Sequence, residues 1–190
     1  MKVGILALQG DFYLHKNSLD ILGVNSIYVK KEKDLLNCDS LILPGGESTA
    51  MSILIRNYDL YNPIKKYSLN HTIFGTCAGA ILMSKNSNDN RVLNFSCIDV
   101  KSKRNSWGRQ IESFTDTISL TNDFEVNSLK TSFIRAPKFY DFGSDCTVLG
   151  KYNNEPVLIR NNMHIISSFH PEMHNKNLAV YKYYLNMING

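Results

Sequence analysis

The sequence predicts an α/β fold with a mostly parallel central sheet, helices on both faces, and antiparallel additions in the C-terminal half. VGILAL at 3–8 is a continuous apolar run, as in a central strand that is covered on both faces. Strand-like and helix-like patterns then alternate, which favours right-handed crossovers between parallel strands. From about residue 98 the pattern changes to short strand-like pieces, which favours hairpins and antiparallel pairing. The expected architecture has three layers.

In the first half, apolar runs and turn residues place the elements. The expected elements are strands at 3–8, 26–30, 40–44 and 72–75 and helices at 12–22, 51–56 and 77–84. Gly23 is placed to end the first helix, since glycine commonly follows a helix C-terminus. Ser48 and Thr49 stand where the second helix should begin.

In the second half, the expected strand-like pieces lie at 97–103, 110–120, 131–136, 146–152, 155–160 and 164–169. Asn153 and Asn154 stand between two of them and predict a hairpin turn. Apolar residues at helical spacing over 177–188 predict a closing helix. No internal repeat or linker interrupts the pattern, so we expect one domain over residues 1–190.

The composition is that of a globular protein. Of 190 residues, 43% are hydrophobic and 20% charged, and no apolar run approaches the length needed to span a bilayer. The apolar run at the N-terminus is too short for a signal peptide, because polar residues follow it directly. We therefore expect a cytoplasmic protein. A net charge of +4 with dispersed lysines disfavours nucleic-acid binding. The cysteines form no metal-ligand pattern, so we expect neither metal nor cofactor.

Cys77 lies in GTCAG (75–79), between an apolar strand and an apolar helix. Glycines at 75 and 79 permit a tight backbone and the close approach of a substrate. The helix would aim free N–H groups at the sulfur and favour the nucleophilic thiolate. The pattern parallels the nucleophile elbow of hydrolases, but a small buried cysteine in a glycine-rich turn would also produce it. The other cysteines lack this frame and are expected to be packing or incidental thiols: Cys38, Cys97 and Cys146.

A nucleophile needs a base, and the base needs an orienting group. SFHPE (168–172) offers His170 and Glu172 directly after an apolar strand. In an extended segment these two side chains share a side, and Pro171 is expected to keep the pair out of a helix. Glu172 would fix the tautomer of His170 and leave its other nitrogen for the sulfur. The remaining histidines have no such partner close in sequence and are expected to be surface or packing residues: His15, His71, His164 and, nearest to the motif, His174.

PGGES (44–48) is a candidate oxyanion site. Its backbone N–H groups follow a strand that should neighbour the Cys77 strand, and ligands bind beyond the carboxyl ends of parallel strands. A plain turn before a helix is the alternative.

These pieces together resemble the class I (triad) glutamine amidotransferases, in which the oxyanion loop, the cysteine and His-x-Glu follow in this order. More closely, nearly the whole chain resembles the glutaminase subunits of pyridoxal 5'-phosphate synthases. The matching segments are GILALQGD (4–11), LILPGGEST (41–49), FGTCAGAIL (74–82), RNSWGRQIESF (104–114), FIRAP (133–137) and SFHPE (168–172). GTCAG and HPE indicate only some triad amidotransferase, whereas ALQGD, RNSxGRQ and IRAP are more specific to this group.

The resemblance implies a class I glutamine amidotransferase-like fold and the hydrolysis of L-glutamine to glutamate and ammonia. Cys77 would attack the amide and form a glutamyl thioester. His170 would protonate the leaving ammonia and then activate water, and Glu172 would orient His170. The Gly46 N–H would stabilise the oxyanion, with Gly45 shaping the turn. Six residues would bind glutamine: Gly46, Glu47, Ser48, Arg104, Ile134 and Arg135.

An arginine in this set also has a chemical reason that does not depend on the resemblance. Glutamine carries an α-carboxylate, and arginine is a natural partner for that group. Without the resemblance, Arg104 and Arg135 would be read as ordinary surface charge. Arg109 and Arg160 are the other arginines considered for this role. Trp107 replaces the usual phenylalanine after RNS and keeps an aromatic ring there. The loop at 85–93 looks divergent and polar.

The resemblance also implies a partner, a (β/α)8-barrel synthase that makes pyridoxal 5'-phosphate from ribose 5-phosphate and glyceraldehyde 3-phosphate. The expected complex holds twelve synthases and twelve glutaminases, and ammonia passes inside it. The isolated glutaminase is expected to have weak activity, because docking of the synthase completes the oxyanion hole. The loop at 9–11 is a candidate for the contact, although Gln9 could equally be a polar residue that ends a strand.

Three alternatives remain from the sequence. The chain could be a glutaminase that serves another synthase, such as those for guanylate, histidine or carbamoyl phosphate; the group-specific motifs argue against this. It could be an α/β cysteine hydrolase acting on peptides or small aldehydes, against which HPE and the paired arginines argue. It could be an inactive regulatory or scaffold subunit, against which intact Cys77, His170 and Glu172 argue.

Overall fold

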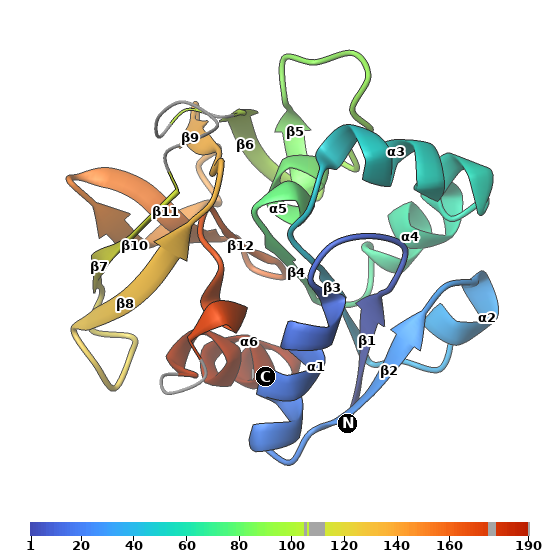
Figure 1. The fold of residues 1–190 in the computed structure, drawn as a ribbon, viewed down its shortest axis with the longest axis horizontal. Coiled ribbons are helices and arrows are strands. Elements are labelled where there is room, and N and C mark those ends of the chain that lie inside the picture. The colour runs from blue at the N-terminus through green and yellow to red at the C-terminus, as the bar shows by residue number, and fades with distance from the viewer. Residues whose placement is uncertain (105, 107–112, 175–177, 190) are drawn as a thin grey trace.

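The computed structural model describes residues 1–104, 106, 113–174 and 178–189, and it has the expected three-layer α/β architecture (Figure 1). Within these residues a nine-stranded sheet runs in the order β2-β1-β3-β4-β12-β11-β10-β7-β8. The strands from β2 to β12 in this order are parallel, and those from β11 to β8 are antiparallel to their neighbours. The loops that follow the carboxyl ends of the parallel strands therefore lie together at one end of these strands.

The first half follows the predicted alternation closely. Its elements are β1 (Lys2–Leu6), α1 (Phe12–Ile21), β2 (Asn25–Val29), α2 (Glu32–Leu35), β3 (Ser40–Leu43), α3 (Ser48–Asn57), α4 (Tyr61–Tyr67), β4 (Ile73–Thr76) and α5 (Ala78–Met83). Gly23 ends α1 as expected, with φ of +69° and a hydrogen bond from the Val24 N–H back to the Leu19 carbonyl. This is the pairing of a glycine-terminated helix. The sequence reading missed α2 and α4.

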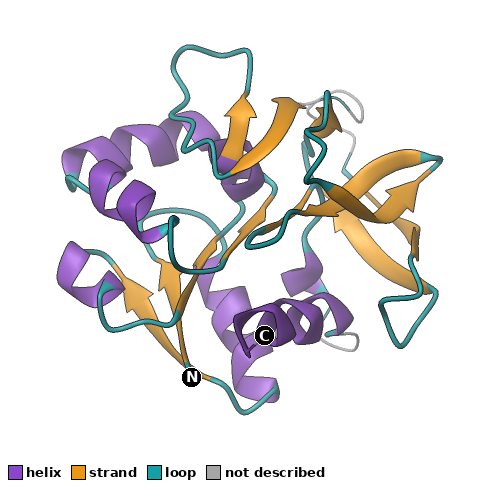
Figure 2. Ribbon diagram, turned by 180° about the vertical axis from the view of Figure 1, so that it is seen from behind, coloured by secondary structure: helices purple, strands orange, loops and turns teal. Residues whose placement is uncertain are grey.

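Two apolar clusters lie on the two faces of the parallel strands. In β3, Leu41 and Leu43 point to one cluster and Ile42 to the other, as the period of a strand requires. Helices α3, α4 and α5 cover the first face, and α1 and α6 (Ala179–Asn189) cover the second (Figures 1 and 2). Because both faces are covered, the parallel strands read as continuous apolar runs.

The second half is more varied than its sequence indicates. Its elements are β5 (Ser84–Asn86), β6 (Ile98–Lys103), β7 (Phe114–Leu120), β8 (Ser128–Phe133), β9 (Lys138–Tyr140), β10 (Thr147–Tyr152), β11 (Glu155–Arg160), β12 (Ile165–Ser167) and η1 (Pro171–Met173). The β10–β11 hairpin turns at Asn153 and Asn154 as predicted, and both residues have positive φ. Such a turn matches the twist of the flanking strands.

Two expectations for this half are wrong. The strand expected at 97–103 does not join the main sheet: β6 pairs with β5 and β9 in a separate three-stranded sheet. The strand expected at 164–169 is shorter and is not purely antiparallel, because β12 runs parallel to β4 while pairing antiparallel with β11. Pairing partners depend on long-range packing, which a local apolar pattern does not encode. No helix among the described residues is long and apolar enough to cross a membrane.

Candidate active site

The carboxyl ends of four parallel strands converge on one edge of the sheet. The loop at 9–11 follows β1, PGGES follows β3, Cys77 follows β4, and His170 lies shortly beyond β12. Strands β3 and β4 pair directly, as expected from the sequence, and β4 pairs with β12. Ligands of open α/β sheets bind at such an edge.

Cys77 occupies a sharp turn between β4 and α5. Its φ of +46° and ψ of −102° lie outside the regions that side-chain-bearing residues favour. Its N–H donates to the Ser167 carbonyl at 2.8 Å, which ties the turn to β12. A Cβ on Gly79 would lie 1.9 Å from the Leu43 oxygen, and one on Gly75 would lie 2.5 Å from the Met83 sulfur. The flanking glycines therefore let α5 pack directly against β3 and β4.

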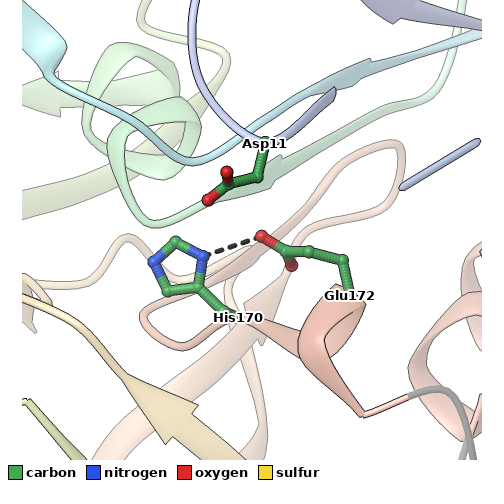
Figure 3. Close-up of side chains that lie close together, drawn as sticks. All are labelled: Asp11, His170 and Glu172. Carbon is green, nitrogen blue, oxygen red and sulfur yellow. Dashed lines mark hydrogen bonds and ion pairs between the residues drawn. The ribbon is translucent and has the colours of Figure 1, made fainter. Parts of the chain in front are cut away.

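His170 and Glu172 form a buried pair. His170 Nδ1 lies 2.7 Å from Glu172 Oε1, and the two side chains face each other in Figure 3. The His170 N–H donates to the Ser132 carbonyl, which anchors the backbone before the pair. His170 is 3% exposed and Glu172 is fully buried.

The expectation that Pro171 keeps this pair out of a helix is wrong. Pro171 is the first residue of the 3₁₀ turn η1, and Glu172 is its second. Proline fits the first position of a helical turn, because its missing N–H would have no partner there. His170 stands just before the turn, with φ of −106° and ψ of 86°. The 3₁₀ turn, rather than an extended segment, places the Glu172 carboxylate beside the His170 imidazole.

The charges of the pair support each other. Burial alone would lower the pKa of His170, but the nearby Glu172 and Cys77 raise it well above its usual value. Burial would raise the pKa of Glu172, but His15 and His170 lower it below its usual value. The Cys77 thiol points at the Ile134 carbonyl, 3.6 Å away, and its contact with the His170 side chain is among the causes of the raised His170 pKa. The pairing with Glu172 therefore favours an imidazolium whose other N–H is on the side of the sulfur.

A pocket of about 300 Å³ opens beside the cysteine. Its lining residues are Asp11, Gly46, Glu47, Ser48, Cys77, Ile81, Arg104, Ile134, Arg135 and His170. Every site residue expected from the sequence lines this pocket except Gly45 and Glu172. Gly45 lies behind the pocket against His170, since a Cβ there would lie 2.3 Å from the imidazole Cε1. Arg160, at the end of β11, does not line it, while Arg109 and Trp107 lie outside the described residues.

Arg104 is held at the pocket by two carboxylates. Its guanidinium donates to Glu47 Oε1 at 2.7 Å, to Asp89 Oδ2 at 2.6 Å and to Thr49 Oγ1 at 3.1 Å. Glu47 also caps α3 by accepting from the Thr49 and Ala50 N–H groups. Asp89 belongs to the loop that the sequence presents as divergent and polar. Its part in the site was missed, because its partner is fifteen residues away.

The loop after β1 covers the PGGES loop. Gln9 Oε1 accepts the Glu47 N–H at 3.0 Å. Gly10 has φ of +91°, and a Cβ there would lie 1.8 Å from the Gly45 oxygen. A side chain at Gly46 would meet Gln9 Oε1 at 2.4 Å. Glycines are therefore required where the two loops touch.

Two further residues near the pair were missed from the sequence. A carboxylate oxygen of Asp11 lies within 4.8 Å of an imidazole nitrogen of His170 and of a carboxylate oxygen of Glu172 (Figure 3). These three could in principle surround a cation, but the direct His170–Glu172 hydrogen bond already accounts for the central contact. His15 is fully buried, with Nε2 3.6 Å from Glu172 Oε1. His174 Nε2 instead lies 2.9 Å from Ser132 Oγ and does not line the pocket.

Known proteins resemble this chain over nearly its full length. It is 41% identical to the pyridoxal 5'-phosphate synthase subunit PdxT of Francisella philomiragia, covering 98% of this chain and 99% of that one. It is also 41% identical to the protein of the same name from Thermosipho africanus, covering 99% of each. A solved structure titled as a glutamine amidotransferase matches with a TM-score of 0.91 and 36% identity over 99% of both chains.

More distant structures share the fold alone. A putative GMP synthase subunit from Thermoplasma acidophilum superposes with a TM-score of 0.69 at 15% identity, covering 100% of this chain and 94% of that one.

The sequence model of the SNO glutamine amidotransferase family matches residues 5–190. The chain therefore belongs to the SNO glutamine amidotransferase family.

Proposed function

We propose that this chain is the glutaminase subunit of a pyridoxal 5'-phosphate synthase and hydrolyses L-glutamine to L-glutamate and ammonia. The observation that carries the proposal is the convergence of Cys77, on a strained strand-to-helix turn, with the buried His170–Glu172 pair at one pocket. This is the arrangement of a nucleophile, a base and an orienting carboxylate. The near-full-length relatives named as pyridoxal 5'-phosphate synthase subunits support the choice of pathway.

The proposed reaction has two halves. The Cys77 sulfur attacks the side-chain amide carbon, and collapse of the tetrahedral intermediate breaks the C–N bond and forms a glutamyl thioester. His170 donates a proton to the departing nitrogen, which leaves as ammonia. His170 then takes a proton from water, whose oxygen attacks the thioester, and glutamate leaves as the thiol is restored. Glu172 holds the imidazole orientation and stabilises its charged form throughout.

The pocket supplies the groups that glutamine requires. Arg104 and Arg135 offer positive charge for the α-carboxylate, and the Ile134 backbone lies beside the sulfur. Glu47 is one of two carboxylates that line the pocket, with Asp11, and would accept from the α-ammonium group; Gly46 and Ser48 also line the pocket. Gly46 would donate its N–H to the oxyanion, while Gly45 leaves room for His170.

We further propose that this oxyanion site is completed by a partner. Beside the Gly46 N–H, the Glu47 N–H would be a second donor, but in the isolated chain it is taken by Gln9 Oε1, so it can join the oxyanion site only if Gln9 moves. Gln9 belongs to the loop at the sheet edge, where a docked protein could displace its side chain. The expected partner is the (β/α)8-barrel synthase, in a complex of twelve subunits of each kind. Ammonia would pass inside that complex to the synthase.

The decisive experiment measures glutamate release from glutamine with and without the cognate barrel synthase. Strong activation by the synthase supports the reaction and the partner together. Activity that ignores the synthase would keep the triad but contradict the partner, and would favour another amidotransferase or a free-standing hydrolase. No activity in either condition would overturn the proposal in favour of a regulatory or scaffold subunit.

Two of the three proposed catalytic residues can be separated by substitution. Cys77→Ala should abolish glutamate release and leave synthase binding intact. His170→Asn should stop turnover while glutamine affinity stays nearly unchanged, which isothermal titration measures directly. A large loss of affinity in His170→Asn would instead make His170 a binding residue.

A further inference from the structure

Glu172 is a buried carboxylate with an incomplete set of partners. Its Oε1 pairs with His170 Nδ1, but its Oε2 has no hydrogen-bond partner among the described residues. A fully buried carboxylate is costly to keep ionised unless neighbouring groups stabilise the charge. The proposed reaction needs that charge, because it supports the imidazolium of His170. A second group that stabilises Glu172 would therefore act on the reaction without touching the substrate.

His15 is placed to be that group, and it approaches Oε1, the oxygen that also pairs with His170, rather than Oε2. It projects from α1 and is fully buried, 157 positions before Glu172 in the sequence. Its Nε2 lies 3.6 Å from Glu172 Oε1 and 3.2 Å from Thr76 Oγ1. The distance to the carboxylate is too long for a direct hydrogen bond, but an N–H dipole at this range still stabilises negative charge in a dry interior.

The other face of the ring is held by the C-terminal helix. Tyr181 of α6 places its hydroxyl 2.7 Å from His15 Nδ1, and both residues are fully buried. The aromatic rings of Phe74 and Tyr181 pack edge-on against the imidazole. The ring is therefore fixed in position by β4 and α6 as well as by its own helix.

These contacts select one tautomer. A lone pair on Nε2 would face the negative carboxylate of Glu172, so the carboxylate favours the tautomer with the proton on Nε2, where the Thr76 hydroxyl can accept it. Nδ1 is then an acceptor, and the Tyr181 hydroxyl donates to it. A buried tyrosine hydroxyl thus sets the orientation of an imidazole dipole aimed at the proposed catalytic carboxylate.

Burial keeps His15 neutral against the pull of the carboxylates around it. The charged and titratable groups that face it are Glu172 from η1, His170 before η1, Asp11 before α1 and Tyr181 from α6. Burial lowers the pKa of His15 and outweighs the opposing pull of Glu172. Neutrality suits the site, since a cation at His15 would compete with His170 for the charge of Glu172.

We propose that His15, oriented by Tyr181, is a positioning residue of the triad that holds Glu172 ionised and aimed at His170. The proposal rests on the proposed glutaminase function and deepens it. A series of contacts between buried polar side chains links the closing helix α6 to the reacting sulfur. It runs through Tyr181, His15, Glu172, His170 and Cys77. A packing role alone would not require an imidazole whose proton faces a carboxylate.

The test compares three variants in the complex with the synthase. His15→Leu removes the donor and keeps the bulk, whereas His15→Gln can return an N–H near the Nε2 position. His164→Leu is the matched control, because His164 is also buried but contacts the Ile73 N–H at the opposite end of β4. Steady-state kinetics are measured across pH.

We expect His15→Leu to lower kcat by about tenfold, equivalent to about 1.4 kcal/mol of barrier, with less than about threefold change in KM. The acid limb of kcat/KM should move to higher pH, because Glu172 loses an N–H dipole that stabilises its ionised form. His15→Gln should recover most of the rate and the original limb. His164→Leu should leave both unchanged.

The proposal is overturned if His15→Leu matches the wild type, or if the control reproduces its kinetic changes. It is also overturned if Gln rescues nothing. Should His15→Leu fail to fold, Tyr181→Phe decides the question, since it removes only the hydroxyl that fixes the tautomer. It should shift the acid limb the same way by a smaller amount, and an unchanged limb would overturn the proposal.

A second readout separates this inference from the proposed function. Alkylation of Cys77 by iodoacetamide, followed by peptide mass spectrometry, reports the support of the thiolate without any glutamine. Burial raises the pKa of each of the other thiols, Cys38, Cys97 and Cys146, to about 11, so they should react slowly near neutral pH. His15→Leu should slow alkylation of Cys77 and His164→Leu should not. An inactive wild type with this pattern would sink the function and keep the inference, whereas equal alkylation rates in an active wild type would sink the inference alone.

Discussion

At Cys77 the backbone carries strain that only the surrounding structure can hold. A non-glycine residue with φ of +46° and ψ of −102° costs on the order of 1–3 kcal/mol. The hydrogen bond from its N–H to Ser167 and the close packing of α5 keep it there. Strain of this kind gathers at functional sites, and here it presents the largely buried Cys77 side chain to the pocket.

Glycine and alanine at position 77 should therefore differ in stability. Both changes remove the sulfur and should end glutamate release. Cys77→Gly relieves the torsional strain, so we expect it to be more stable than Cys77→Ala by about 1 kcal/mol. Urea denaturation of the two variants measures the difference. An alanine variant that is equally stable would show that the turn is not strained.

Asp89 shows how a residue outside the motifs enters a site. It accepts a hydrogen bond from Arg104 and also pairs with the exposed Arg91. Bonds from Arg91 come first among the causes that hold the pKa of Asp89 well below its usual value. Asp89 is therefore ionised at neutral pH and restrains the guanidinium that should bind the substrate carboxylate.

Asp89→Asn should raise KM for glutamine by about three- to tenfold with little change in kcat, because a misplaced Arg104 costs about 1 kcal/mol of binding. Arg91→Gln is the control, since Arg91 touches Asp89 but not Arg104. Initial-rate measurements with the synthase give both constants. A fall in kcat at unchanged KM would contradict a binding role for this cluster.

At the scale of elements, a buried histidine joins the starts of two central strands. His164, just before β12, accepts the Ile73 N–H at the start of β4 through Nδ1 at 3.2 Å. Burial lowers the pKa of His164 to about 4. The folded protein therefore holds this imidazole neutral at pH values where the unfolded chain, with an ordinary pKa near 6.5, already binds a proton.

This pairing predicts acid sensitivity. The unfolded state binds more protons between about pH 6.5 and 4, so stability is full above this window and falls as pH falls, by at most about 3 kcal/mol. His164→Gln should be less stable than wild type at pH 7.5 but lose less on moving to pH 5. Urea midpoints at both pH values measure this. His71→Gln, at a half-exposed ring stacked on Tyr67, should follow the wild type. An undiminished acid loss in His164→Gln would contradict the assignment.

At the scale of the whole molecule, the candidate site exists because loops from distant parts of the chain meet at one sheet edge. Gly10 and Gly45 come from the loops after β1 and β3 and touch backbone to backbone. Through this contact Gln9 reaches the Glu47 N–H. The two loops therefore form one unit that a docking partner can address.

Gly10→Ala should disturb that unit. The added Cβ would lie 1.8 Å from the Gly45 oxygen at a φ of +91°, so we expect a loss of at least about 2 kcal/mol and of synthase-stimulated glutamate release. Gly23→Ala is the matched control, because Gly23 also has positive φ, at +69°, but an added Cβ meets nothing within 4 Å. It should cost about 1 kcal/mol and keep full activity. Thermal unfolding and the coupled assay compare them. Equal activity in both variants would show that the loop contact is dispensable.

Several features were accessible from sequence because their determinants are local. The continuous apolar runs at β1, β3 and β4, the glycine that ends α1 and the paired asparagines of the hairpin each act over a few residues. The candidate triad was also accessible, since its glycine-framed cysteine and His-Pro-Glu are short motifs. The extent of the single domain stays a prediction.

What the sequence determined by itself was the α/β class and the alternation of strands and helices in the first half, and with the family resemblance it predicted most residues of the candidate pocket. Only the tertiary structure decided the separate sheet around β6, the parallel pairing of β12 with β4, and the 3₁₀ turn that presents Glu172. It alone brought Asp89 to Arg104 and His15 to Glu172. The physical reason is separation along the chain, because these contacts join residues whose local patterns carry no sign of each other and gain their free energy only once the core has packed.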